Sequence, residues 1–150
     1  MLVKKLISFS AISIAMSIIG SLSMIILLSQ HANAADLTIN ISDIEQGKGH
    51  VLVALFTGKE NYNEGKSVKA TKVKADNKME SVVFKDLVDG EYAVKMYQDE
   101  NDNAELDRNI MGIPKEGYGF SNNVGMFGTP KYKEAKFIVK NNTIIEVDLF

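Results

Sequence analysis

The 150-residue chain contains no cysteine and no tryptophan, and it has only two histidines and two prolines. Without cysteine it cannot form a disulfide, a thiolate metal site or a thiol nucleophile. A lipid-anchored bacterial lipoprotein also needs a cysteine, so this class is excluded. His31 falls in the export segment described below, which leaves His50 as the one imidazole of the mature chain. A multi-histidine metal site is therefore excluded, and we expect His50 to be a polar residue at the start of a strand.

A surplus of positive charge is absent as well. Seventeen Lys and Arg residues stand against nineteen Asp and Glu, for a formal net charge of -2, and the basic residues form no cluster. Nucleic acids are bound through stripes of positive charge, so no nucleic-acid partner is expected. The 45% content of hydrophobic residues is typical of a globular protein, and the length suits a single domain.

The first 34 residues have the pattern of an export signal. Lys4 and Lys5 precede an uncharged, mostly apolar run over residues 6–28, and residues 32–34 supply the small-x-small cleavage pattern. Cleavage would leave residues 35–150, with fifteen basic and nineteen acidic side chains. Because the apolar run is long enough to cross a bilayer, an uncleaved N-terminal anchor is the alternative. The sequence predicts export to the periplasm or the extracellular space, with this signal helix as the only membrane contact.

Residues 35–150 show the two-residue alternation of strands, and no amphipathic helix of useful length. About seven strands are expected, at residues 36–41, 50–56, 68–74, 79–85, 91–98, 135–140 and 143–149. Short strands that each have an apolar face are typical of an antiparallel β-sandwich with Greek-key connections, transthyretin-like or immunoglobulin-like. Residues 59–67 are expected to form either a loop or one helical turn packed through Tyr62.

Three of these segments carry more specific predictions. The strand at 50–56 is apolar on both faces, which indicates burial on both sides. The strands at 68–74 and 79–85 are expected to form a hairpin around residues 75–78. The last two strands are joined at Asn141 and Asn142, which tolerate positive φ.

The chemistry concentrates in residues 99–107, of sequence DENDNAELD. Oxygen-bearing side chains occupy alternate positions: Asp99, Asn101, Asn103, Glu105 and Asp107. Alternate residues of a curled loop can all turn inward, and calcium accepts about six to eight oxygens in irregular geometry. The segment holds five carboxylates in nine residues, and these repel one another without a counter-ion. The pattern predicts a calcium site formed by these five side chains.

This segment matches the helix-loop-helix calcium pattern only in part. The first, third and fifth ligand positions agree, but Ala104 replaces the glycine of the sixth position and Ile110 replaces the glutamate of the twelfth. Glu116 is the nearest carboxylate that can complete the ligand set, with water as the alternative. The affinity expected is weak, about 10⁻⁴ to 10⁻³ M. The competing interpretation is a solvated acidic loop whose Asn and Asp residues only form turns.

Residues 109–123 form a second segment of interest, too apolar to be a disordered loop. Its side chains, including Ile110, Met111 and Ile113, are expected to pack back on the sandwich. Tyr118 and Phe120 are either anchors of this loop or a stacking platform for a sugar.

Several blocks occur together in a characteristic order. They are FKDLVDGEYAV at 84–94, DENDN at 99–103, LD at 106–107, GIP at 112–114 and EGYGFSN at 116–122. From about Leu37 to the C-terminus the chain resembles the bacterial exported family catalogued as domain of unknown function 2141. The resemblance implies a transthyretin-like or prealbumin-like β-sandwich behind a signal, with no established activity. It also implies that the acidic loop and the aromatic segment are family features, with Ala104 replacing the usual glycine.

Three functions are consistent with the sequence. The first is an exported, non-catalytic binding or structural module, with loop 99–107 ordered by calcium and the partner a cell-envelope protein or glycan. The second is a carbohydrate-binding module that uses Tyr118 and Phe120. The third is a glycan hydrolase with Glu116 and Asp107 as acid and base, since two carboxylates suffice for glycoside hydrolysis. The first is favoured because it needs no catalytic group and no deep cleft.

Overall fold

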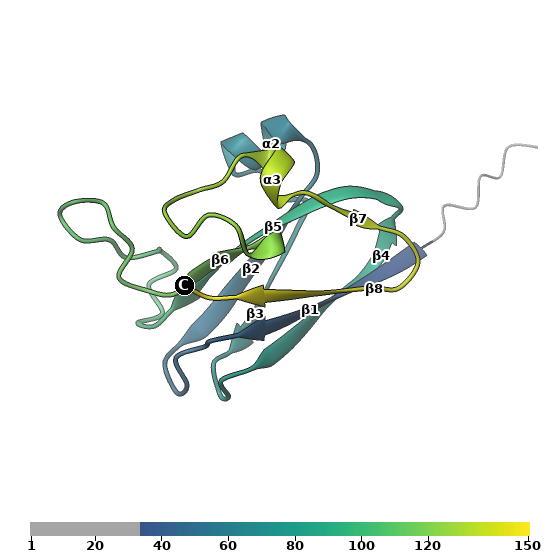
Figure 1. Ribbon diagram of the computed structural model, residues 1–150. Helices are drawn as coiled ribbons and strands as arrows, with labels where there is room; N and C mark the ends of the chain where they lie inside the picture. The colour runs from purple at the N-terminus through teal and green to yellow at the C-terminus, as the bar shows by residue number, and fades with distance from the viewer. Residues whose placement is uncertain (1–33) are drawn as a thin grey trace, which may run out of the picture. The chain divides into compact units, whose positions relative to one another are not determined.

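The computed structural model describes residues 34–150, so the predicted export segment lies outside the described residues except for Ala34. Within this range eight strands form two sheets (Figure 1). The first sheet has the order β4 (Glu80–Val88), β1 (Ala34–Ser42), β8 (Thr143–Asp148). The second has the order β3 (Lys69–Lys74), β2 (His50–Phe56), β5 (Gly90–Asp99), β6 (Tyr118–Phe120), and β7 (Phe137–Val139) also pairs with β5. The predicted all-β sandwich is confirmed.

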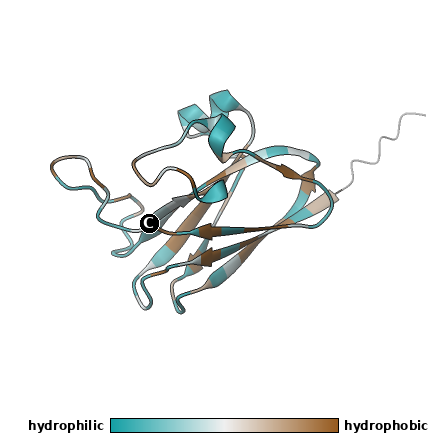
Figure 2. Cartoon of the chain, viewed as in Figure 1, coloured by the Kyte–Doolittle hydropathy of each residue, from teal (hydrophilic) through white to brown (hydrophobic). Residues whose placement is uncertain are grey.

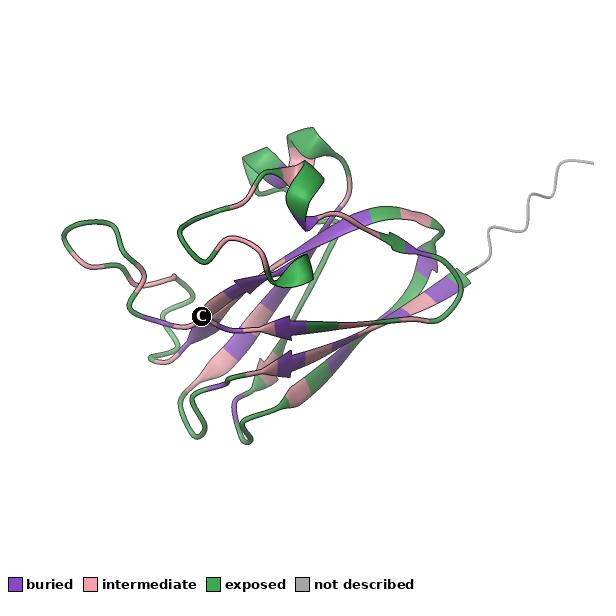
Figure 3. Ribbon diagram, viewed as in Figure 1, coloured by how far each residue is buried: buried purple, intermediate pink, exposed green. Residues whose placement is uncertain are grey.

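The core lies between the two sheets and follows from the alternation of the sequence. In β1, Leu37, Ile39 and Ile41 are fully buried, and the residues between them are half-buried (Figure 3). Apolar and polar residues alternate along the strands accordingly (Figure 2). Each buried aliphatic side chain of this size contributes about 1.5 to 3 kcal/mol. Packing the two inner faces is therefore the main source of stability.

Strand pairing departs from expectation in two places. The hairpin predicted for residues 68–74 and 79–85 is wrong, because β3 pairs with β2 in one sheet and β4 pairs with β1 in the other. In addition, β1 and β8 are parallel, with Leu37 opposite Thr143, whereas all other strand pairs are antiparallel. The turn at Asn141, which has φ 54°, likewise carries the chain from one sheet to the other.

Two short helices cover one end of the outer face of the five-stranded sheet (Figure 1). They are α2 (Lys59–Glu64) and α3 (Tyr132–Ala135), and a 3-10 turn, η1 (Ser121–Asn123), lies just before α3 in the chain. The predicted helical turn packed through Tyr62 is confirmed, since this residue is only 1% exposed. Its ring meets Phe56 and Tyr132 with centroids 5.6 Å away in each case. None of the helices within residues 34–150 is long and apolar enough to cross a membrane.

The turn between β1 and β2 is fixed against the end of β5. The buried side chain of Gln98 accepts a hydrogen bond from the Glu45 backbone N–H and donates to the carbonyls of Glu45 and Lys48. Gly49 has φ +56°, and a Cβ at this position would lie 1.8 Å from the Asp99 carbonyl oxygen. Only glycine allows this approach, which holds the turn next to the acidic loop.

We expect Gly49→Ala to lower the free energy of unfolding by about 3 kcal/mol or more, because backbone must move in addition to the left-handed strain. Gly47→Ala is the matched control, because it has φ +83° but open space around the position of its Cβ. Its cost should be the conformational strain alone, about 1 to 2 kcal/mol. Urea unfolding of both variants measures the difference, and equal losses would contradict the proposed close contact.

The hydroxyl of Tyr62 is buried without a hydrogen-bond partner among the described residues. Burial, with a smaller contribution from the charge of Glu134, raises the pKa of Tyr62 to about 12. Since the folded-state pKa exceeds the ordinary value of 10.0, ionisation of this buried group opposes folding, and stability that is fully present below pH 10 is lost as the pH rises toward 12.

Tyr62→Phe removes an unsatisfied polar atom, so it should raise the free energy of unfolding by about 1 kcal/mol at pH 8. It should also reduce the loss of stability between pH 10 and pH 12. Denaturant unfolding at pH 8 and pH 11 tests both points. A variant that is less stable at pH 8 would show that the hydroxyl makes a favourable bond.

Candidate functional site

The acidic loop leaves the sheet at Asp99, the last residue of β5. The Asp99 side chain is only 3% exposed, and its carboxylate turns back into the loop. Its Oδ1 accepts a hydrogen bond from the Asn103 backbone N–H at 3.0 Å, and its Oδ2 accepts one from the Ala104 N–H at 2.8 Å. The loop therefore curls around this carboxylate.

Asp107 lies at the centre of a second set of contacts. Its two carboxylate oxygens accept hydrogen bonds from the side-chain amides of Asn101 and Asn103, at 2.8 and 3.2 Å. The amide oxygens of the same two asparagines accept from the backbone N–H groups of Asn103 and Glu105, at 3.1 and 2.8 Å. Four of the five predicted ligand side chains thus belong to one network. The fifth, Glu105, takes part only through its backbone.

Glu116 holds the two ends of the loop together. It is only 7% exposed, and its carboxylate accepts hydrogen bonds from the backbone N–H groups of Glu100 at 2.9 Å and Asp107 at 2.8 Å. The sequence singled out this residue as a sixth ligand. The structure places Glu116 against the loop, where its two hydrogen bonds close the loop.

Two carboxylates on the outer side of the loop, Glu100 and Asp102, have basic partners. Lys48 Nζ lies 3.0 Å from Glu100, and His50 Nδ1 lies 2.5 Å from Asp102. Across residues 34–150, no Lys, Arg or His side chain lies within ion-pair distance of Asp99, Asp107 or Glu116. In the same range, no three acidic, histidine or cysteine side chains surround a common point suited to a metal. Any ion held here would be bound by a mixture of carboxylates, amides and backbone carbonyls.

Ala104 adopts a left-handed conformation, with φ +64°. This is the position where the sequence has alanine in place of the expected glycine. Its carbonyl accepts a hydrogen bond from the Tyr97 hydroxyl at 2.9 Å, which ties the tip of the turn to β5. The backbone geometry that favours glycine is therefore present, and Ala104 is conformationally strained because its Cβ disfavours the left-handed region.

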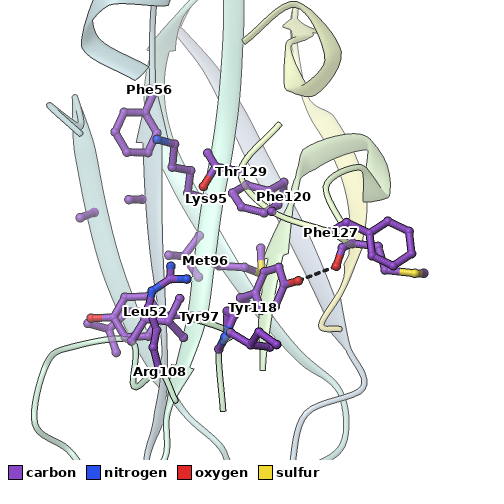
Figure 4. A pocket seen from close by; sticks show the side chains of 18 of the residues that line it. Leu52, Phe56, Lys95, Met96, Tyr97, Arg108, Tyr118, Phe120, Phe127 and Thr129 are labelled. Atoms are coloured by element: carbon purple, nitrogen blue, oxygen red, sulfur yellow. Dashed lines mark hydrogen bonds between the residues drawn. The ribbon is translucent and has the colours of Figure 1, made fainter. Parts of the chain in front are cut away.

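A groove lies beside this loop, on the part of the outer face that α2 and α3 leave uncovered. Its volume is about 640 Å³, within the range of about 300 to 1,000 Å³ usual for small-molecule sites. Leu52 of β2 and Lys95 and Tyr97 of β5 form the floor of the groove, and Figure 4 shows their side chains among those that line it. One wall continues from the acidic loop through Leu106, Arg108 and residues 112–114, and the other is formed by residues 126–129.

Large apolar side chains are exposed along both walls. Ile113, Met126 and Phe127 line the groove and are exposed, and Ile110 and Met111 are exposed in the loop next to it. The prediction that residues 110–113 pack back on the sandwich is therefore wrong. The loop projects from the end of the sandwich with an apolar tip (Figure 2), and only Tyr118 and Phe120 return to the sheet, where they form β6 beside β5.

The aromatic pair does not form a flat exposed platform. Phe120 is buried, and its ring meets that of Tyr118 at 70°, with centroids 6.0 Å apart. The Tyr118 hydroxyl donates to the Met126 carbonyl, which fixes the second wall of the groove (Figure 4). Tyr118 and Phe120 therefore anchor the loop to the sheet, as the first of the two interpretations predicted. Asp107 and Glu116 do not line the groove, and their oxygens are engaged with the loop itself.

Sequence reasoning did not find the groove. The sequence feature that could have indicated the groove is the strand at 50–56, which is apolar on both faces. We interpreted this pattern as burial on both sides. Val51, Val53 and Leu55 do face the core, but Leu52 and Ala54 on the opposite face are half-buried and line the groove. Arg108 belongs to no recognised sequence motif, so we did not predict it as a functional residue.

The fold and the site define a small β-sandwich with one long acidic loop set beside an apolar groove. Residues 39–146 match the family model described as "Uncharacterized protein conserved in bacteria (DUF2141)", so the chain belongs to this family. No curated protein and no solved structure matches the chain.

Ala104→Gly should relieve the left-handed strain and raise the free energy of unfolding by about 0.5 to 1 kcal/mol, after the entropic cost of glycine. Ala70→Gly, in a strand and without positive φ, is the control and should lower it by a similar amount. Chemical denaturation measures both. A loss at both positions would mean that Ala104 is not strained.

Proposed function

We propose that the protein is an exported, non-catalytic binding module whose loop 99–107 binds a calcium ion. The observation that carries the proposal is the network of Asp99, Asn101, Asn103 and Asp107, which gathers side-chain oxygens in one turn. Within residues 34–150 no basic side chain forms an ion pair with it. Oxygen ligands from carboxylates, amides and carbonyls are those that calcium prefers.

The electrostatics of the loop support a bound cation. Asp99 and Glu116 are both buried, and burial of a carboxylate is costly unless it is hydrogen-bonded or paired. Hydrogen bonds from N–H groups partly stabilise these carboxylates, but among the described residues no basic side chain lies within ion-pair distance of Asp99, Asp107 or Glu116. A divalent cation would supply that charge.

The alternatives gain less support. A sugar platform needs exposed, coplanar rings, and Tyr118 and Phe120 stand edge to face. A glycan hydrolase needs two carboxylates that flank a substrate, whereas the Glu116 carboxylate accepts two backbone hydrogen bonds and lies outside the groove. Export is supported by the charged and apolar pattern of residues 1–34.

A thermal or chemical unfolding experiment with calcium and with a chelator tests the proposal. At 10 mM calcium and the weak affinity expected, the folded state should gain about 1.4 to 2.7 kcal/mol. The absence of any gain would reject the calcium site.

Asp107→Asn should lose most of this gain, because it removes one of the two carboxylates in the network. Asp102→Asn removes the same charge from the same loop, but from a side chain that faces His50, so it should keep most of the gain. Equal losses in both variants would indicate a general attraction between calcium and an acidic loop, with no defined site.

A further inference from the structure

The groove has an electrostatic character opposite to that of the whole chain. Two of its lining residues, Lys95 and Arg108, are cationic, and none is acidic. The chain as a whole carries a formal net charge of -2. The rest of the lining is largely aliphatic and aromatic, so positive charge is placed within apolar surroundings.

Neither cation has an anionic partner in the part of the chain that the structure describes. Lys95 Nζ donates to the Tyr62 carbonyl at 2.6 Å and lies over the Tyr62 ring, 4.0 Å from its centroid. Among the described residues, neither Lys95 nor Arg108 has a carboxylate within ion-pair distance. Burial also lowers the pKa of Lys95, which reflects the desolvation of its ammonium group.

Arg108 is the cation with more free donors. Its guanidinium makes one hydrogen bond in this part of the chain, from Nη1 to the Gly112 carbonyl at 2.9 Å. Figure 4 shows it at one end of the groove beside Leu52 and Tyr97, with Lys95 at the other end beside Phe56. A planar guanidinium with unpaired N–H groups is suited to bidentate binding of a carboxylate or phosphate.

We propose that this groove binds a single-chain amphiphile, whose alkyl chain lies along the apolar floor between the two walls and whose anionic head group is bound by Arg108. Charge complementarity selects an anion, and the apolar lining selects a chain over a free ion. This site shares no ligand residue with the proposed calcium site, so the proposal does not rest on calcium binding.

Calorimetric titration of the exported domain with decanoate, dodecanoate and tetradecanoate, below their micellar concentrations, tests the proposal. Affinity should rise about threefold to fourfold for each added methylene. Inorganic phosphate alone should not bind. The same titrations in calcium and in chelator should both show binding, which keeps this result separate from the fate of the calcium site.

Arg108→Gln should weaken binding of dodecanoate about tenfold and leave the uncharged dodecanol unaffected. Lys115→Gln is the matched control, an exposed cation of the same loop that does not line the groove. It should change neither affinity. Equal losses in the two variants would overturn the assignment of Arg108.

Ala70→Phe tests the groove independently of charge. Ala70 lies opposite Ala54 in the β2 and β3 pair and lines the groove, so a phenyl ring there should reduce binding of both dodecanoate and dodecanol at least tenfold, in a variant whose melting confirms folding. Binding that survives this change would overturn the proposal. So would adsorption to phosphatidylglycerol vesicles equally by the wild type and Ala70→Phe, or a self-association that this variant abolishes, because the apolar walls would then serve a membrane or a second copy.

Discussion

Two packed sheets have four faces, and packing them together buries only two. In this protein the inner faces form the main core, and the outer face of the three-stranded sheet is mostly polar, with Val83, Val88 and Ile144 as its exposed apolar residues. The outer face of the five-stranded sheet is different, because its middle strands are apolar there as well. Two short helices cover one end of that face through Tyr62 and Phe56. At the other end no helix formed by residues 34–150 covers the face, and the loops that contain residues 106–114 and 126–129 flank it, so that a groove forms between them.

The acidic loop and the groove are parts of one structure. The same stretch of chain first curls around Asp99, is closed by Glu116, and then supplies Leu106 and Arg108 to the groove wall. Whatever stabilises the curled loop therefore also positions that wall. The stability of the curled loop and the shape of the groove are coupled in this way, because one segment of chain forms both.

Most strands could be predicted from the sequence because alternation records which side chains face the core. Strand 50–56 was predicted with the observed bounds. Partners could not be predicted the same way, since alternation is the same whether a strand pairs within a hairpin or crosses to the other sheet. This is why β3 and β4 were wrongly paired.

The candidate site was predicted unevenly for a related reason. Asp99, Asn101, Asn103 and Asp107 are close in sequence, so their convergence follows from a local turn. The groove depends on residues from β2, β3, β5 and two loops, whose juxtaposition only the fold determines. The exposed apolar tip of residues 110–113 was missed because hydrophobic residues are expected to be buried, although functional surfaces are the exception.

The parallel pairing of β1 with β8 has a consequence for how the molecule is made. The first strand of the sandwich and the last one share a register over residues 37–42 and 143–148. Contacts between residues so far apart in the chain slow folding, because a long segment must be ordered before they form. The three-stranded sheet is incomplete until the final residues are available. For the export proposed above, such a delay would keep the chain unfolded during its passage across the membrane.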